Sequence, residues 1–203
     1  TGDYGSGKSS FALLLAHLFS ARTAQLPDHL SPAIELVQKN NEVGSLIPVL
    51  VTGSREPMAV ALLRALQPTL QDLGKTKHKK ILQDIQQVLA YAAEVPIADA
   101  TVLAIVNETI QSINKKEHGK GVLIILDEMG KFLEYAALHP DQQDVYLLQR
   151  LSEAATRSGN QPLFVIGLLH QAFIAYIDQL SQSTEWEKVA GRFDEILFNH
   201  PIE

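Results

Sequence analysis

The sequence Gly-Asp-Tyr-Gly-Ser-Gly-Lys-Ser at residues 2–9 fits the pattern G-x-x-x-x-G-K-[ST] at each fixed position. Its glycines let the backbone turn tightly, so that successive N–H groups point inward at a phosphate. Lys8 adds a positive charge that reaches the β- and γ-phosphates, and the Ser9 hydroxyl suits Mg²⁺. The predicted phosphate-binding residues are Gly2, Asp3, Tyr4, Gly5, Ser6, Gly7, Lys8, Ser9 and Ser10.

A strongly apolar helical pattern follows this motif, which is known as a P-loop. We expect a helix over residues 8–22, with its N-terminus under the phosphates, where the partial positive charge of the helix dipole favours an anion. The alternative is a chance glycine-rich turn before a helix. A second matching motif downstream argues against that alternative.

The second motif is an apolar run at residues 122–126 that ends in two acids, Asp127 and Glu128, the pattern called Walker B. A carboxylate at the carboxyl end of a buried strand next to the P-loop strand can hold Mg²⁺, which assigns Asp127 to the metal together with Ser9. Glu128 is the predicted general base that polarises the attacking water. The Asp-Glu pair favours hydrolysis over transfer to a small substrate. The alternative is a strand that ends in a solvated acidic turn.

A third polar position follows the apolar run at residues 163–169, where His170 and Gln171 stand. A side chain there would hydrogen-bond the γ-phosphate or the attacking water, and His170 is the preferred candidate, with Gln171 second. The alternative is a polar strand end that touches only solvent.

Strand patterns alternate with helical ones along the chain, which predicts an α/β fold, a three-layer α/β/α sandwich of the P-loop NTPase type with a mostly parallel sheet. The expected strands are residues 46–52, 122–126, 163–169 and 195–198. Residues 27–32 are an expected loop, and the expected helices are residues 8–22, 33–38, 57–66, 81–94, 97–115, 141–158 and 172–180, the last extending towards residue 189. Lys131 and Glu134 would form a surface pair if their segment is helical.

Residues 66–120 hold more helix than a strand–helix–strand crossover needs, so we expect a helical insertion there. The insertion contains the basic run of residues 74–80. A solvated loop between helices is the preferred interpretation, and a contact to nucleic acid or to an acidic partner is the alternative.

The bulk composition sets limits on the whole chain of 203 residues. Its net charge of −6 argues against a protein that binds nucleic acid through its overall charge. It has no cysteine, hence no disulfide or thiolate metal site, which fits a cytoplasmic protein. No apolar run reaches the roughly 18 residues that span a membrane, so we expect no membrane contact. A P-loop follows a buried strand, and none precedes residue 2, so we expect residues 1–203 to be the core of a longer protein.

The segment Gly191-Arg-Phe-Asp194, with Ile196 and Pro201 after it, resembles the end of the core of AAA+ ATPases, and the other motifs stand in the AAA+ order. In that family an arginine here reaches the nucleotide of a neighbouring subunit and stabilises the transition state, and Arg192 is the matching residue. The family often carries another arginine three positions earlier, where this chain has Val189 beside Lys188. Arg192 therefore acts either in trans or structurally before the last strand, and Arg157 is a weaker rival.

The resemblance implies that the chain binds and hydrolyses ATP with Mg²⁺, as part of a homo-oligomer that acts on DNA or other protein subunits. Residues 126–134 and 186–193 are also similar to large ATPases of bacterial phage-exclusion and DNA-modification-linked defence systems. The family's helical lid would follow residue 203. Alternatives are a signalling-type (STAND-like) nucleotide switch, a nucleotide-dependent DNA-binding scaffold and, least favoured, a small-molecule kinase.

Overall fold

The computed structural model describes residues 1–2, 7–20, 27–40, 45–116, 118–139, 144–177 and 183–197. Four of the predicted P-loop residues, Asp3, Tyr4, Gly5 and Ser6, lie outside these ranges. So do Arg22, Phe198 and Pro201.

A small parallel sheet forms the centre of the molecule. Its strands are β1 (Leu46–Thr52), β2 (Gly121–Asp127) and β3 (Leu163–Gly167), in the order β1-β2-β3. Thr52 stands opposite Asp127, and Leu126 stands opposite Gly167. The carboxyl ends of the three strands therefore meet at one edge of the sheet, which we call the carboxyl edge. The predicted α/β class and parallel sheet are confirmed.

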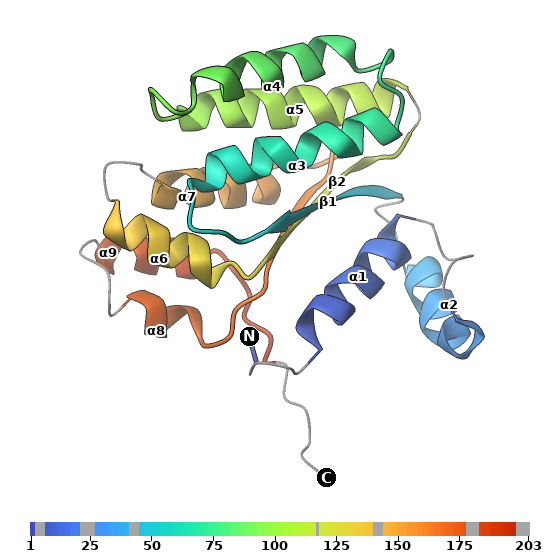
Figure 1. Ribbon diagram of the computed structural model, residues 1–203. Coiled ribbons are helices and arrows are strands. Elements are labelled where there is room, and N and C mark those ends of the chain that lie inside the picture. The colour runs from blue at the N-terminus through green and yellow to red at the C-terminus, as the bar shows by residue number, and fades with distance from the viewer. Residues whose placement is uncertain are drawn as a thin grey trace.

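Helices cover both faces of this sheet, because the strand residues alternate between two apolar sets. One set includes Val49 and Ile124 and packs against α3 (Met58–Asp72), α5 (Asp99–Lys115) and α7 (Asp144–Thr156) in the main core. The other set includes Leu123 and Ile125 and packs against Ala12 and Ala16 of α1 (Lys8–Phe19). Figure 1 shows α1 below the sheet and α3, α5 and α7 above it.

Two further elements extend these layers. The helix α4 (Lys79–Tyr91) lies over α3 and α5 and sends Ile81, Leu82 and Ile85 into the main core (Figure 1). The helix α2 (Ser31–Asn40) follows the short 3₁₀ helix η2 (Asp28–Leu30) and contacts α1. Residue 66, where the predicted insertion starts, lies inside α3, and residues 66–120 contain α4 and α5.

The remaining helices lie towards the carboxyl edge. They are α6 (Gly130–Leu138), α8 (Phe173–Ile177) and α9 (Ser183–Ala190). The helix α6 begins three residues after β2 ends, and it contacts α7 and α8. Lys131 and Glu134 do lie in this helix. The short helices thus surround the end of the sheet where the predicted catalytic residues stand.

Three predicted elements are corrected. Residues 195–197 are not a strand, because they lie in solvent with no sheet neighbour that buries them: Ile196 is 77% exposed and Leu197 65% exposed. The single helix predicted from residue 172 towards 189 is two separate helices, α8 and α9. The predicted loop at residues 27–32 is mostly helical, since η2 occupies residues 28–30 and α2 begins at Ser31.

The described helices include none that is both long enough and apolar enough to cross a lipid bilayer.

Candidate functional site at the carboxyl edge of the sheet

The described part of the P-loop motif sits at the start of α1. Gly7 adopts the left-handed conformation with φ of 83°, which a glycine accepts without steric cost, and it caps α1. Lys8 is buried, and its ammonium group donates a hydrogen bond to the carbonyl oxygen of Gly2. The Gly2 N–H in turn donates to the carbonyl oxygen of Leu169, just beyond β3, at 3.1 Å. These contacts hold the start of α1 against the end of β3.

Ser9 and Ser10 lie in the first turn of α1 and are exposed. This helix end has no acidic residue in its first turn, so its positive dipole end is not offset by a side chain of its own. Ser9 is exposed at this helix end, and its role as a magnesium ligand stays a prediction.

The two acids stand at the end of β2 and are held by the neighbouring strand β1. The Gly53 N–H donates to the carbonyl oxygen of Asp127 at 2.7 Å, and a Cβ placed on Gly53 would lie 2.2 Å from the carbonyl oxygen of Glu128. Only a glycine permits this approach. The sequence shows Gly53 as the end of a strand, but its contact with Glu128 needs the strand order.

Glu128 has an unusual backbone. Its φ of 51° makes it the one non-glycine residue with positive φ among those that the structure describes. Its N–H donates to Asp127 Oδ1 at 2.9 Å, and the Met129 N–H donates to the carbonyl oxygen of Leu168 at 3.0 Å. The turn after β2 is therefore tied to both neighbouring strands, and strained backbone of this kind is often found at functional sites.

Lys131 is a member of the site that sequence reasoning missed. Its ammonium group pairs with Glu128 Oε2 at 2.5 Å, so the predicted surface pair of Lys131 with Glu134 is wrong. The spacing of three residues permits this pair as well as the other, but only the turn at Glu128 brings its carboxylate to Lys131. The spacing of three residues between Glu128 and Lys131 is therefore the sequence signal that could have suggested this pair.

His170 lies where the charges of the site converge. Burial and the nearby Lys8 ammonium lower the pKa of His170, whereas the carboxylates of Glu128 and Asp127 raise it, and Lys131 lowers it further. The net effect is a lowered pKa, which favours the neutral form of the imidazole. Gln171, the second candidate, is exposed.

We call this group the carboxyl-edge cluster. It consists of Lys8, Asp127, Glu128, Lys131 and His170. Three segments that are far apart in the sequence supply two cations, two carboxylates and an imidazole at one place. The start of the chain reaches this cluster beside β3 rather than beside β2, which corrects the expectation that Asp127 stands on the strand next to the P-loop.

The oxygen ligands of the site are of the kind that Mg²⁺ prefers. One hydroxyl and one carboxylate can coordinate Mg²⁺ together with water and phosphate oxygens. Ser9 and Asp127 are exposed enough to serve. Among the described residues there is no group of three or more histidine, cysteine, aspartate or glutamate side chains that would hold a metal by themselves. The residues therefore fit a cation that a bound phosphate helps to hold.

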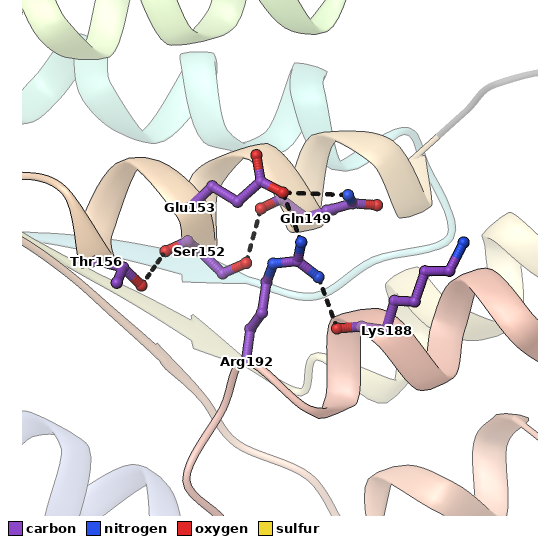
Figure 2. A network of polar contacts seen from close by, with 6 residues as sticks. All are labelled: Gln149, Ser152, Glu153, Thr156, Lys188 and Arg192. Atoms are coloured by element: carbon purple, nitrogen blue, oxygen red, sulfur yellow. Dashed lines mark hydrogen bonds and ion pairs between the residues drawn. The ribbon is translucent and has the colours of Figure 1, made fainter.

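Arg192 is not part of the carboxyl-edge cluster. Figure 2 shows its side chain reaching from the end of α9 to α7, where its guanidinium pairs with Glu153 Oε1 at 2.6 Å. It also donates to the carbonyl oxygen of Lys188 at 2.8 Å. Gln149 donates to the same Glu153 oxygen at 3.2 Å, and this bond and Arg192 lower the pKa of Glu153. The structural role predicted for Arg192, at the start of a last strand, is replaced by a link between α9 and α7.

A cavity of about 380 Å³ lies beside the cluster. Its lining includes Lys8, Met129, residues of β3, Phe193 and Ile196. Its walls are mainly apolar, and neither Asp127 nor Glu128 is among its lining residues. The cavity therefore shares Lys8 with the cluster but not the two acids. Arg157, the weaker rival of Arg192, is exposed at the end of α7.

Comparisons with known proteins returned no match for this chain, whether the search was against family models, curated proteins or solved structures.

Proposed function

We propose that this chain binds ATP with Mg²⁺ at the carboxyl edge of its sheet and hydrolyses it to ADP and phosphate. The observation that carries the proposal is the convergence of Lys8, Asp127 and Glu128 on His170. A P-loop lysine, a strand-end aspartate and a following glutamate are the residue types that phosphoryl transfer to water requires. The AAA+ resemblance, and its defence-related branch, extend the proposal to a motor or switch within a larger assembly.

The residues of the chain divide the work. Lys8 and the N-terminal N–H groups of α1 bind and orient the phosphates. Ser9 and Asp127 are the residues that would hold Mg²⁺, which when bound offsets the negative charge of the phosphates. Glu128 accepts a proton from the attacking water as its oxygen bonds to the γ-phosphorus, and the bond from that phosphorus to the bridging oxygen of ADP breaks. His170 orients the water or the γ-phosphate through a hydrogen bond.

Glu128 already has an ion-pair partner in the structure. Its carboxylate is paired with Lys131, and the pair is half-exposed. Surface pairs of this kind contribute only about 0.2–1 kcal/mol, so a water molecule that is held by a γ-phosphate can replace Lys131 as the partner of Glu128. The positive φ of Glu128 aims its side chain from a fixed backbone, which favours a defined position for the base.

The decisive experiment is a nucleotide titration of the wild-type chain and of Lys8→Ala by isothermal calorimetry. We expect at least a tenfold loss of affinity in Lys8→Ala, because a buried cation next to the phosphates is removed. Lys39→Ala, at an exposed lysine of α2, is the matched control and should bind as the wild type does. Equal affinity in Lys8→Ala and the wild type would contradict the assignment of the P-loop.

Assembly is the second part of the proposal, and Arg192 is the residue that tests it. For Arg192 to reach a neighbouring nucleotide, it must exchange Glu153 for a phosphate. Turnover per chain should then rise with protein concentration and fall in Arg192→Ala. Mixing Arg192→Ala with Glu128→Gln chains should restore part of the turnover, since each variant supplies what the other lacks. Turnover that is independent of concentration and survives Arg192→Ala would contradict a shared site.

A specific observation also favours the second candidate, a signalling-type nucleotide switch. Arg192 is held within its own chain by Glu153 and by the carbonyl oxygen of Lys188, which is the arrangement expected of a self-contained resting state. In a switch, nucleotide is retained and turnover is slow until a trigger breaks this link. The same concentration series distinguishes the two candidates.

A further inference from the structure

A second polar site lies on the outer helical layer, at the start of α4 and the end of α5. It is a pocket of about 290 Å³, which we call the lysine pocket. Its polar lining includes Lys77, His78, Lys80, Glu108, Gln111, Ser112, Lys115 and Lys116. Because α5 ends shortly before β2 begins, this pocket lies towards the opposite end of the sheet from Asp127 (Figure 1). It is separate from the carboxyl-edge cluster.

The charge of the lysine pocket is strongly positive. Lys80 pairs with Glu108 at 2.7 Å, and Glu108 is the one acid in the lining. Lys77, Lys115 and Lys116 have no such pair among the residues that the structure describes. Three unpaired lysines thus surround one small pocket in a chain whose net charge is −6.

The start of α4 increases this positive charge. The helix α4 begins at Lys79 with no acidic residue in its first turn, so lysines stand at the positive end of the helix dipole. Acids are the residues that stabilise this end, and lysines destabilise it. A turn fixes the arrangement, since the N–H groups of Lys77 and His78 both donate to the carbonyl oxygen of Gly74, at 2.9 and 3.3 Å. An anion would relieve this repulsion.

His78 supplies a second, independent indication of a ligand. It lines the pocket and is only 1% exposed, and its Nδ1 contacts Ser112 Oγ at 3.0 Å. Its Nε2 is buried and finds no hydrogen-bond partner within the described part of the chain. The ring of His118 stands 5.5 Å from that of His78. A buried imidazole that lacks one partner costs free energy, and a bound oxyanion offsets that cost.

We propose that the lysine pocket binds a phosphate group. Lysines supply point charges for phosphate, the first turn of α4 supplies N–H groups, and one member of the hydrogen-bonded pair of His78 and Ser112 donates a hydrogen bond, depending on the tautomer of the imidazole. Carboxylates would suit the same charge, but four lysines line the pocket, and this number of cations matches the charge and the three terminal oxygens of a phosphate better than a singly charged carboxylate. The phosphate comes either from a nucleic-acid backbone or from a small phosphate compound, and the experiment below separates these sources.

The test uses the full 203-residue chain carrying Lys8→Ala, so that the P-loop does not contribute phosphate binding. Two probes are used: a fluorescent DNA duplex, followed by anisotropy at several salt concentrations, and inorganic pyrophosphate, followed by the NMR signals of the His78 ring. The variant is Lys77→Ala with Lys116→Ala. The matched control is Lys75→Ala with Lys120→Ala, which removes the same charge from exposed lysines outside the pocket.

We expect the His78 signals to shift with pyrophosphate in the control and to stay unchanged in the Lys77/Lys116 variant. If a nucleic-acid backbone is the source, DNA also binds, and the slope of log affinity against log salt falls by about two in the variant, roughly one for each lysine. Binding of pyrophosphate without DNA identifies a small phosphate compound. The proposal is overturned if neither probe binds, or if the control loses as much binding as the variant.

Discussion

The carboxyl-edge cluster and the lysine pocket are built in opposite ways. The first joins charges of both signs from three distant segments at the ends of the strands and at the starts of α1 and α6. The second gathers mainly positive charge where α4 begins and α5 ends, with Glu108 as the one acid in its lining. Mixed charge on a rigid edge suits a reaction, in which a proton and a phosphoryl group move between fixed groups. Charge of one sign on a helical surface suits binding alone.

Glu128→Gln should produce the largest separation between the two sites. The amide keeps the shape of the side chain but cannot accept the proton of water, so we expect turnover to fall by about 10²–10⁴-fold while ATP still binds. The lysine pocket should bind phosphate unchanged. Steady-state phosphate release and a nucleotide titration measure the two quantities.

Glu134→Gln is the control for this variant, because Glu134 is an exposed acid in α6, the helix that follows Glu128. It should leave turnover at the wild-type level. Persistent hydrolysis in Glu128→Gln would mean that Glu128 is not the base.

Gly53→Ala should have the next largest effect, and its partner at the other end of the sheet is Gly121→Ala. A Cβ at Gly53 meets the backbone oxygen of Glu128 at 2.2 Å, and one at Gly121 meets that of Pro162 at 1.9 Å. Each overlap is with main chain, so the strands must move apart, at a cost of about 1–3 kcal/mol or more. Both variants should lose stability in urea unfolding, but only Gly53→Ala should lower turnover per folded molecule.

The control is Gly191→Ala, whose Cβ would lie an ordinary 3.6 Å from the nearest atom, the Glu187 carbonyl oxygen. It should change neither quantity appreciably. Equal turnover per folded molecule in Gly53→Ala and Gly121→Ala would show that the position of Glu128 does not matter to the reaction.

The sequence predicted the residues of the carboxyl-edge cluster that local motifs define, but not those that tertiary contacts bring to it. Lys8, Asp127 and Glu128 were assigned from local spacing, and β1 was predicted with the bounds that the structure gives it. Residues that owe their place to tertiary contact were missed: Lys131 pairs with Glu128 only because of the turn at that residue, and Gly53 contacts it only because β1 neighbours β2. A local pattern carries no information on either.

The lysine pocket also could not be predicted from local patterns in the sequence. The basic run at residues 74–80 was visible in the sequence, and a solvated loop was the preferred interpretation. Lys115 and Lys116 lie far along the chain, and only the packing of α4 against α5 brings them to this run. The predicted strand at residues 195–198 failed for a related reason, since an apolar run forms a strand only where a neighbour pairs with it.

Lys131→Met should change turnover less than the variants above, and it tests whether Lys131 restrains Glu128. Removing the ammonium group frees the Glu128 carboxylate for water, so turnover should rise by up to about fivefold at low salt, the equivalent of an exposed pair. Added salt should reduce the difference between variant and wild type, because it screens the pair. Turnover assays at two ionic strengths measure this. Unchanged turnover at low salt would mean that Lys131 does not restrain Glu128.

The smallest expected effect is a difference in how the two sites respond to acid. Burial, His118 and the lysines Lys116 and Lys77 lower the pKa of His78, and burial and the same lysines lower that of His118. A lowered pKa in the folded state means that these rings contribute stability above about pH 6.5, their ordinary value, and that this stability is lost as the pH falls. At His170, burial and Lys8 lower the pKa, and the carboxylates of Glu128 and Asp127 act in the opposite direction.

Urea unfolding from pH 7.5 to 5 checks this in the wild type, in His118→Gln and in His29→Gln, which replaces an exposed histidine of η2. Each titrating ring adds a slope of at most about 1.4 kcal/mol per pH unit. His118→Gln should flatten the acid loss, both by removing its own titration and by removing one cause of the lowered pKa of His78, and His29→Gln should not. Phosphate in the lysine pocket favours the charged imidazoles, so pyrophosphate should reduce the acid loss in the wild type. An acid profile that pyrophosphate leaves unchanged would mean that the two histidines do not contact the proposed ligand.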